Sequence, residues 1–153
     1  MREARHVDLW ENFTTPLHRI GISTNGYIKR NGQAVMGRGC AKQLCDLVPG
    51  TAARLGVYLK RQGNTPGYLI LGPESGPPPT DRVMILPVKH NWYEKADLEL
   101  VSRSVDFLIS EALAHADWTF HVPRLGCGNG RLSWEHEVRA HMQCLPDNCV
   151  VHS

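Results

Sequence analysis

The sequence predicts an α/β domain, in which helices cover both faces of a central sheet. Short apolar runs that are typical of buried strands alternate with stretches whose apolar residues recur at helical spacing. The expected strands are 18–24, 68–72, 82–89, 118–123 and 149–152, and the expected helices are 41–48, 51–62, 96–116 and 134–145. Ligands of such domains bind beyond the carboxyl ends of the strands, so a site is expected at that edge of the sheet.

Stop signals and apolar runs define the elements of the first half. Strand 18–24 ends at an Asn-Gly pair, and the two helices that follow it end at Pro-Gly and Gly-Asn pairs. The runs 68–72 and 82–89 are continuously apolar. We therefore expect both of these strands to be buried on both faces.

Periodicity defines the helices of the second half. Helix 96–116 has the best apolar stripe of the chain, formed by Leu98, Val101, Val105, Leu108, Ile109 and Ala112. Ser133 is the expected N-cap of the last helix, because a serine hydroxyl can accept from the backbone N–H groups of the first turn. The proline-rich stretch 73–81 is expected to be a surface hairpin or connection.

Size and composition are those of a soluble globular protein. The chain has 153 residues, of which 42% are hydrophobic and 21% charged, so we expect one domain over residues 1–153. A formal charge of +2 is too small to indicate a nucleic-acid partner by itself. No stretch approaches the length of a membrane span, and the N-terminus has no apolar signal region. We expect a cytoplasmic monomer without a membrane partner.

The cysteines show no pattern of a disulfide framework or a zinc site. The chain has five of them, an odd number, without a CxxC pair or a paired zinc spacing. They are Cys40, Cys45, Cys127, Cys144 and Cys149. We expect reduced thiols that act as small buried residues, with no metal site and no cofactor.

Two glycine-rich stretches lie just before expected helices. Residues 37–39 read Gly-Arg-Gly, and residues 126–130 read Gly-Cys-Gly-Asn-Gly. Glycine lets a ligand approach the backbone closely, and free N–H groups near a helix N-terminus attract phosphate. Neither stretch is a Walker loop or a GxGxxG fingerprint. Spacing alone leaves two explanations open, tight turns and a cradle for a ligand with more than one phosphate.

Lys89 ends the apolar strand 82–89, which places its charge at the carboxyl edge of the sheet. It can be a solvated strand end. It can also be a partly desolvated amine whose lowered pKa suits nucleophilic or proton-transfer chemistry. His90 and Glu94 are titratable neighbours, for which solvation of the loop is the simpler explanation.

Taken together, these stretches resemble the macrodomain family, which binds ADP-ribose on a three-layer α/β/α fold with a central mixed sheet. The resemblance covers nearly the whole chain in the expected order. It is carried by DLW (8–10), TNG (24–26), AVMGRGCA (34–41), VKHNWYEKADLELVSRS (88–104) and VPRLGCGNGRLSWE (122–135). The most similar branch removes ADP-ribose with a lysine and includes protein-glutamate glycohydrolases and DNA-linked ADP-ribose hydrolases.

The resemblance implies roles for individual residues. Lys89 falls where that branch keeps its catalytic lysine. Asp8 would accept from the adenine amino group, although the residue alone suggests a turn or a helix cap. The loops 36–41 and 125–130 would enclose the diphosphate and the distal ribose. The implied ligand-binding residues are Asp8, Leu9, Thr24, Asn25, Gly37, Arg38, Gly39, Cys40, Ala41, Pro123, Leu125, Gly126, Cys127, Gly128, Asn129 and Gly130.

One departure from the branch keeps two function classes open. Some members pair the lysine with an aspartate in the second glycine loop, but the matching position here is Gly130, and no acid lies between Gly126 and Leu132. Lys89 favours a hydrolase that acts on ADP-ribosylated DNA or protein or on a free ADP-ribose ester. Gly130 favours a module that binds ADP-ribose without turnover. A structural protein without a ligand would leave both glycine loops without a role.

Overall fold

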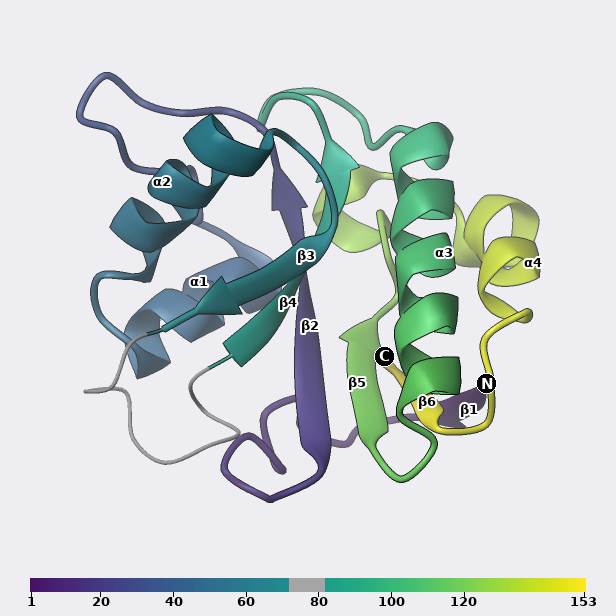
Figure 1. Cartoon of the computed structure of the whole chain (residues 1–153). Coiled ribbons are helices and arrows are strands. Elements are labelled where there is room, and N and C mark those ends of the chain that lie inside the picture. The colour runs from purple at the N-terminus through teal and green to yellow at the C-terminus, as the bar shows by residue number, and fades with distance from the viewer. Residues whose placement is uncertain (72–81) are drawn as a thin grey trace.

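The computed structural model describes residues 1–71 and 82–153, and the expected loop 73–81 lies outside these residues. The strands are β1 (Arg2–Ala4), β2 (His18–Asn25), β3 (Gly67–Ile70), β4 (Arg82–Lys89), β5 (Thr119–Pro123) and β6 (Cys149–His152). The α-helices are α1 (Gly39–Leu47), α2 (Thr51–Gln62), α3 (Leu98–Ala114) and α4 (Arg139–Met142). The alternation of strands and helices that the sequence predicts is confirmed (Figure 1).

The described strands form one mixed sheet in the order β1-β6-β5-β2-β4-β3. All neighbouring strands are parallel except β3, which runs antiparallel to β4. The helices α1 and α2 cover one face of the sheet, and α3 and α4 cover the other (Figure 1). The expected three-layer α/β/α architecture with a mixed sheet is therefore confirmed.

Strand β4 connects the two hydrophobic cores because successive side chains of a strand point to opposite faces. Val83 and Ile85 pack with the core beneath α1 and α2. Met84, Leu86 and Val88 pack with the core beneath α3 and α4. All five side chains are buried, as expected for a strand covered on both faces.

The expectation of double burial is wrong for β3. Among the described strands, β3 lies at the edge of the sheet and pairs with β4 alone. Leu69 is buried, but the side chain of Ile70 is 65% exposed. The apolar run at 68–72 therefore does not indicate burial on both faces. An edge strand with one covered face can carry an exposed isoleucine without a large cost in folding free energy.

The helices begin and end close to the expected residues. Asp97 caps α3, since its side chain accepts from the backbone N–H of Glu99. Ser133 is confirmed as a cap, because its hydroxyl accepts from the N–H of His136 at 3.2 Å. The helix that it starts is less regular than expected, with a π-helical turn over Trp134–Val138 before α4.

The cysteines are free thiols, as expected. Cys149 is buried and three others are half-buried, but Cys144 is exposed, so the prediction that all five are small buried residues is wrong for this one. Among the residues that the structure describes, no helix is both long and apolar enough to cross a membrane.

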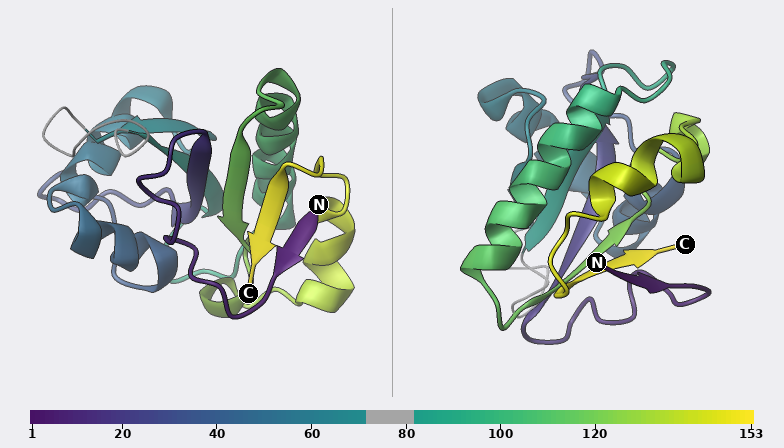
Figure 2. Two further views of the ribbon diagram at one scale, coloured as in Figure 1. Left: turned by 90° about the horizontal axis from the view of Figure 1, so that it is seen from below. Right: turned by 90° about the vertical axis from the view of Figure 1, so that its right-hand side faces the viewer.

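The connection between β1 and β2, residues 5–17, crosses one face of the sheet. It must do so because β6 and β5 lie between β1 and β2 in the strand order. Figure 2 (left) shows this connection in purple as it runs from β1 to β2. Trp10 anchors it in the core beneath α1, and the indole N–H of Trp10 donates to Gln43 Oε1 of that helix at 2.8 Å.

Candidate functional site

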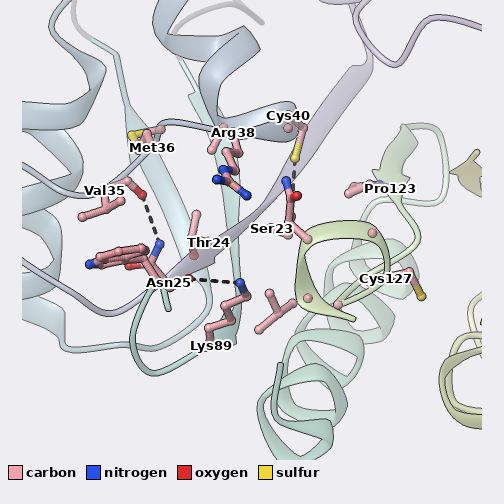
Figure 3. Close-up of a pocket in the computed structure, with 18 of the residues that line it drawn as sticks. Ser23, Thr24, Asn25, Val35, Met36, Arg38, Cys40, Lys89, Pro123 and Cys127 are labelled. Carbon is pink, nitrogen blue, oxygen red and sulfur yellow. Dashed lines mark hydrogen bonds between the residues drawn. The ribbon is translucent and has the colours of Figure 1, made fainter. Parts of the chain in front are cut away.

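A cavity of about 800 Å³ lies beyond the carboxyl ends of β2, β4 and β5. This is the edge at which the fold class predicts a ligand, and the volume is within the range of small-molecule sites. Figure 3 shows that Thr24, Arg38 and Lys89 extend into it from different elements. All but three of the predicted site residues line the cavity: Thr24, Asn25, Gly37, Arg38, Gly39, Cys40, Ala41, Lys89, Pro123, Gly126, Cys127, Gly128, Asn129 and Gly130.

The three predicted residues outside the lining are Asp8, Leu9 and Leu125. Leu125 is fully buried in the core beneath α3, so it supports the second glycine loop from below. Asp8 Oδ1 accepts from the N–H of Trp10 at 3.0 Å, which is the turn contact that the residue alone suggests. Leu9 packs against the core beneath α1.

The first glycine loop leads into the N-terminus of α1 at the cavity. Arg38 is the N-cap residue, but its side chain makes no capping hydrogen bond, and the first turn contains no acid. The first N–H groups of α1 therefore have no partner from a cap, and the helix dipole adds positive potential there. This end of the cavity is suited to an anion.

The surroundings of the glycines differ from one position of the two loops to another. A Cβ at Gly126 would lie 2.8 Å from Leu132, and one at Gly130 would lie 3.0 Å from Ala96, so packing explains both. A Cβ at Gly37 or Gly128 would meet nothing within 4 Å. These two glycines face open space in the cavity wall, which leaves room for a ligand, and Gly128 also has a φ of 69°, as a tight turn requires.

Thr24 and Asn25 form the end of β2 at the cavity floor. Thr24 is 5% exposed, and its hydroxyl has no hydrogen-bond partner among the described residues. The Asn25 side chain donates to the carbonyl of Val35 at 3.1 Å, which fixes the chain before the first glycine loop (Figure 3). A buried hydroxyl without a partner costs free energy, and a polar ligand group in the cavity would relieve that cost.

Lys89 is held at both ends. Its carbonyl accepts from the N–H of Gly26 at 3.2 Å and from the Asn64 side chain at 3.0 Å. Its ammonium group donates to the carbonyl of Trp92 at 3.2 Å. Burial lowers the pKa of Lys89 below the usual lysine value, and the positive charges of Arg131 and Arg38 lower it further. The side chain of Lys89 is thus half-buried and partly removed from solvent.

The loop after Lys89 contains the titratable neighbours. His90 Nε2 lies 2.8 Å from Asp97 Oδ2, and the hydrogen bond from His90 lowers the pKa of Asp97. Glu94 lines the cavity and accepts from the side chain of Asn91. His90 therefore has a structural partner, whereas Glu94 is the single carboxylate among the described residues that line the cavity.

Several lining residues were not predicted from the sequence. They are Ser23, Val35, Val88, Trp92, Tyr93, Arg124 and Arg131. The side chains of Trp92 and Tyr93 are 52% and 60% exposed. Two adjacent aromatic residues in a polar loop were the sequence signal from which this part of the lining could have been predicted. Arg131 has a φ of 63°, which is unusual for a residue other than glycine and is not visible in the sequence.

Comparison with solved structures identifies the fold. The chain is similar to the macrodomain of Mycobacterium tuberculosis DarG, with 24% identity and a TM-score of 0.71 over 99% of this chain and 97% of that one. The chain has the macrodomain fold. It is also similar to the macrodomain of Thermus aquaticus DarG, with 22% identity and a TM-score of 0.69 over 99% of this chain and 95% of that one.

Thermosipho africanus DarTG in complex with ADP-ribose matches the same macrodomain fold. The identity is 16% and the TM-score 0.73, over 99% of this chain and 41% of that larger one. No protein-family model and no curated protein matches the sequence. Among the described residues, no group of three or more His, Cys, Asp or Glu side chains could hold a metal ion.

The electrostatic environment of Lys89 can be tested directly. We expect Arg131→Gln to raise the pKa of Lys89 toward the usual lysine value, because it removes a like charge but leaves the burial. The measurement is an NMR titration of labelled lysine side chains. Lys42, whose pKa is raised by its hydrogen bond with Asp46, is the control and should titrate as in the parent. A parent Lys89 that titrates like a free lysine would contradict the expectation.

Proposed function

We propose that this protein binds ADP-ribose and hydrolyses it from a modified macromolecule, DNA or protein, with Lys89 as the catalytic amine. The observation that carries the proposal is the placement of a half-buried lysine in the same cavity as two open glycine loops. The macrodomain fold supports it, because one structure of this fold, Thermosipho africanus DarTG, is a complex with ADP-ribose.

The cavity suits a diphosphate flanked by two sugars. The open glycines Gly37 and Gly128 leave room for phosphate oxygens, and the N-terminus of α1 supplies backbone donors. Arg38 and Arg131 add positive charge, and among the described residues neither forms an ion pair with a carboxylate. The unpartnered hydroxyl of Thr24 can bond to a ribose hydroxyl.

Asp8 is proposed to hold the adenine amino group. Its segment lies beside α1, since Trp10 donates to Gln43 of that helix, and the N-terminus of α1 lines the cavity. One carboxylate oxygen of Asp8 accepts from Trp10 within the turn, and the exposed side chain offers its second oxygen to a ligand. The carboxylate can therefore cap the turn and accept from adenine at the same time.

The reaction has two steps in this proposal. The neutral amine of Lys89 attacks the anomeric carbon of the distal ribose, the bond to the macromolecule breaks, and the leaving group takes the amine proton. The ribose ring of this adduct then opens as the nitrogen proton moves to the ring oxygen, which leaves an imine between Lys89 and the sugar. Water adds to the imine carbon, the carbon–nitrogen bond breaks as both water protons pass to the nitrogen, and ADP-ribose leaves as the open-chain aldehyde with the lysine restored. Glu94 is the lining carboxylate that can accept the proton of this water, in place of the acid that the second glycine loop lacks.

The rim beside Lys89 favours DNA over protein as the macromolecule. Trp92 and Tyr93 are exposed there, with ring centroids 5.4 Å apart in an edge-to-face arrangement. Aromatic faces next to cationic side chains bind unpaired bases, whose stacking contributes about 1–3 kcal/mol per base. A glutamate side chain in a protein would gain no comparable contact from this pair.

The second candidate is a module that binds ADP-ribose without turnover. It is favoured by the absence of an acid from Gly126 to Leu132. The structure adds a reason for this absence, since a side chain at Gly130 would begin 3.0 Å from Ala96 Cβ. Single-turnover release of ADP-ribose from modified DNA and modified protein distinguishes the two candidates.

The diphosphate site is tested by replacing Gly128 with valine. The parent should bind ADP-ribose far more tightly than adenosine, and Gly128→Val should weaken ADP-ribose binding by at least roughly tenfold, because the side chain fills the phosphate space. Calorimetry measures both affinities. Gly63→Val is the matched control: Gly128 and Gly63 both have positive φ, 69° and 80°, and both have open surroundings, but Gly63 lies outside the cavity lining. Equal effects of the two variants would contradict the site.

The chemistry is tested at Lys89. Lys89→Ala and Lys89→Arg should abolish turnover while ADP-ribose still binds, because a guanidinium stays protonated and cannot act as an amine nucleophile. The parent rate should rise with pH until the amine is mostly neutral, at a pH below that of an ordinary lysine because its pKa is lowered. Single-turnover assays measure the rates, and turnover by Lys89→Ala at the parent rate would remove the residue from the mechanism.

The same assays test the second step. Borohydride added during turnover should trap an adduct on the peptide that contains Lys89. Glu94→Gln should still form this adduct but release ADP-ribose more slowly, so more adduct should be trapped than in the parent. Release at the parent rate by Glu94→Gln would exclude its carboxylate as the base. Loss of turnover in Lys89→Ala without any trapped adduct in the parent would leave the lysine an acid/base role.

The choice of macromolecule is tested at the rim. Trp92→Ala and Tyr93→Ala should slow release from modified single-stranded DNA by roughly fivefold or more, because each removes a stacking face. Release from modified protein should change little. Leu113→Ala is the control, since Leu113 is a similarly exposed apolar side chain on α3, outside the cavity lining. Equal slowing with both substrates would indicate that the pair positions Lys89 and does not contact the macromolecule.

A further inference from the structure

Three histidines outside the cavity form a continuous hydrogen-bonded chain. His18 Nδ1 lies 2.8 Å from His121 Nε2, and His121 Nδ1 lies 2.9 Å from His152 Nε2. The last ring ends the chain, with its Nδ1 3.2 Å from the carbonyl oxygen of Val7. His121 and His152 are buried, whereas His18 is half-buried.

The topology brings these residues together. They lie on the neighbouring strands β2, β5 and β6, and they share the face of the sheet opposite α3 and α4. The connection 5–17 crosses this face on its way from β1 to β2 (Figure 2). The Val7 carbonyl belongs to this connection, so the histidine chain attaches the connection to the sheet.

The chain fixes the tautomer of every ring. A carbonyl oxygen can only accept, so His152 must donate from Nδ1, and its Nε2 must then accept. His121 therefore donates from Nδ1 and accepts at Nε2, and His18 donates from Nδ1. All three neutral rings carry their proton on Nδ1, although imidazole in water favours the Nε2–H form.

The donor and acceptor roles of the ring nitrogens also limit how many additional protons the histidine chain can hold. One additional proton can sit on His18 Nε2, at the half-buried end, without disturbing any bond. A second proton would place two N–H groups face to face at one of the ring-to-ring contacts. Burial lowers the pKa of His121 to about 4, and the charges of His152, His18 and Arg2 act in the same direction. On the side of the connection 5–17, the Val7 carbonyl is the group that accepts a hydrogen bond from the histidine chain.

We propose that the chain of His18, His121 and His152 positions the segment that carries Asp8, and thereby makes the affinity for ADP-ribose depend on pH. The inference rests on the proposed function, in which Asp8 holds adenine. The bond from His152 fixes the peptide group between Val7 and Asp8, and the turn bond to Trp10 fixes the Asp8 side chain. Loss of the first bond would free the peptide group between Val7 and Asp8 and misplace the carboxylate, although Trp10 would still anchor the connection beneath α1.

The sign of the pH effect follows from proton uptake. An unfolded histidine titrates near pH 6.5, but His121 in the folded protein does so at about 4. Between these values the unfolded or released state binds more protons, so acid favours it. The attachment should weaken progressively as the pH falls from about 6.5 to about 4, so affinity for ADP-ribose should fall over the same range.

The first experiment is nitrogen NMR of the histidine rings at pH 7.5, which needs no ligand. His121 and His152 are expected in the Nδ1–H form. An Nε2–H tautomer at either ring would overturn the chain, and with it the positioning role. If the parent protein binds no ADP-ribose, the proposed function fails and so does the positioning role, while the tautomers still decide whether the chain exists.

The second experiment compares His152→Leu with His152→Asn by calorimetry with ADP-ribose. The leucine cannot donate to Val7 and should weaken binding roughly tenfold at pH 7.5. The asparagine amide can donate to Val7 from a similar position, so it should restore most of the affinity at pH 7.5. His141→Asn, on the exposed surface of α4, is the control. Parent-like binding and pH dependence in both His152 variants would overturn the proposal, and if the leucine variant does not fold, the asparagine variant and the tautomers decide.

Discussion

The burial of β4 on both faces is the constraint on which the site depends. A strand that packs into two cores cannot carry a charge along its length, because an unpaired buried charge costs several kcal/mol. The side chains from Val83 to Val88 are accordingly apolar, and Lys89 is the first position at which the strand leaves the cores. The position of the amine is therefore set by the layers of the fold, and the bonds that Gly26 and Asn64 donate to its carbonyl keep the strand end from moving.

Positive charge in the cavity determines what it can bind. The pKa of Lys89 is lowered first by burial and then by repulsion from the charges of Arg131 and Arg38. Among the described residues, none of the three forms an ion pair with a carboxylate. An anionic ligand would relieve this repulsion and a neutral one would not, so the charge and the open glycines are both suited to the proposed phosphate ligand.

The sequence predicted the regular parts of the fold and most of the candidate site, because both depend on local patterns. Helix stops, the Ser133 cap and the two glycine loops are encoded by residues next to one another. Edge position, by contrast, depends on strand order, so the exposed face of β3 could not be read from its apolar run. Likewise, the φ of 63° at Arg131 results from how the second loop closes. The histidine chain needs three strands far apart in the sequence and could not be predicted at all.

Strand β5 links the cavity to the histidine chain. Phe120 and Val122 point into the core beneath α3, whereas His121 points to the opposite face and pairs with two other strands. The same strand ends at Pro123, where the second glycine loop begins to line the cavity. The loop that is proposed to enclose the phosphates and the segment proposed to hold adenine are thus both linked to β5, the loop directly and the segment through His152 of β6. A disturbance of His121 would therefore reach both ends of the site, because a buried strand moves as a unit within a close-packed core.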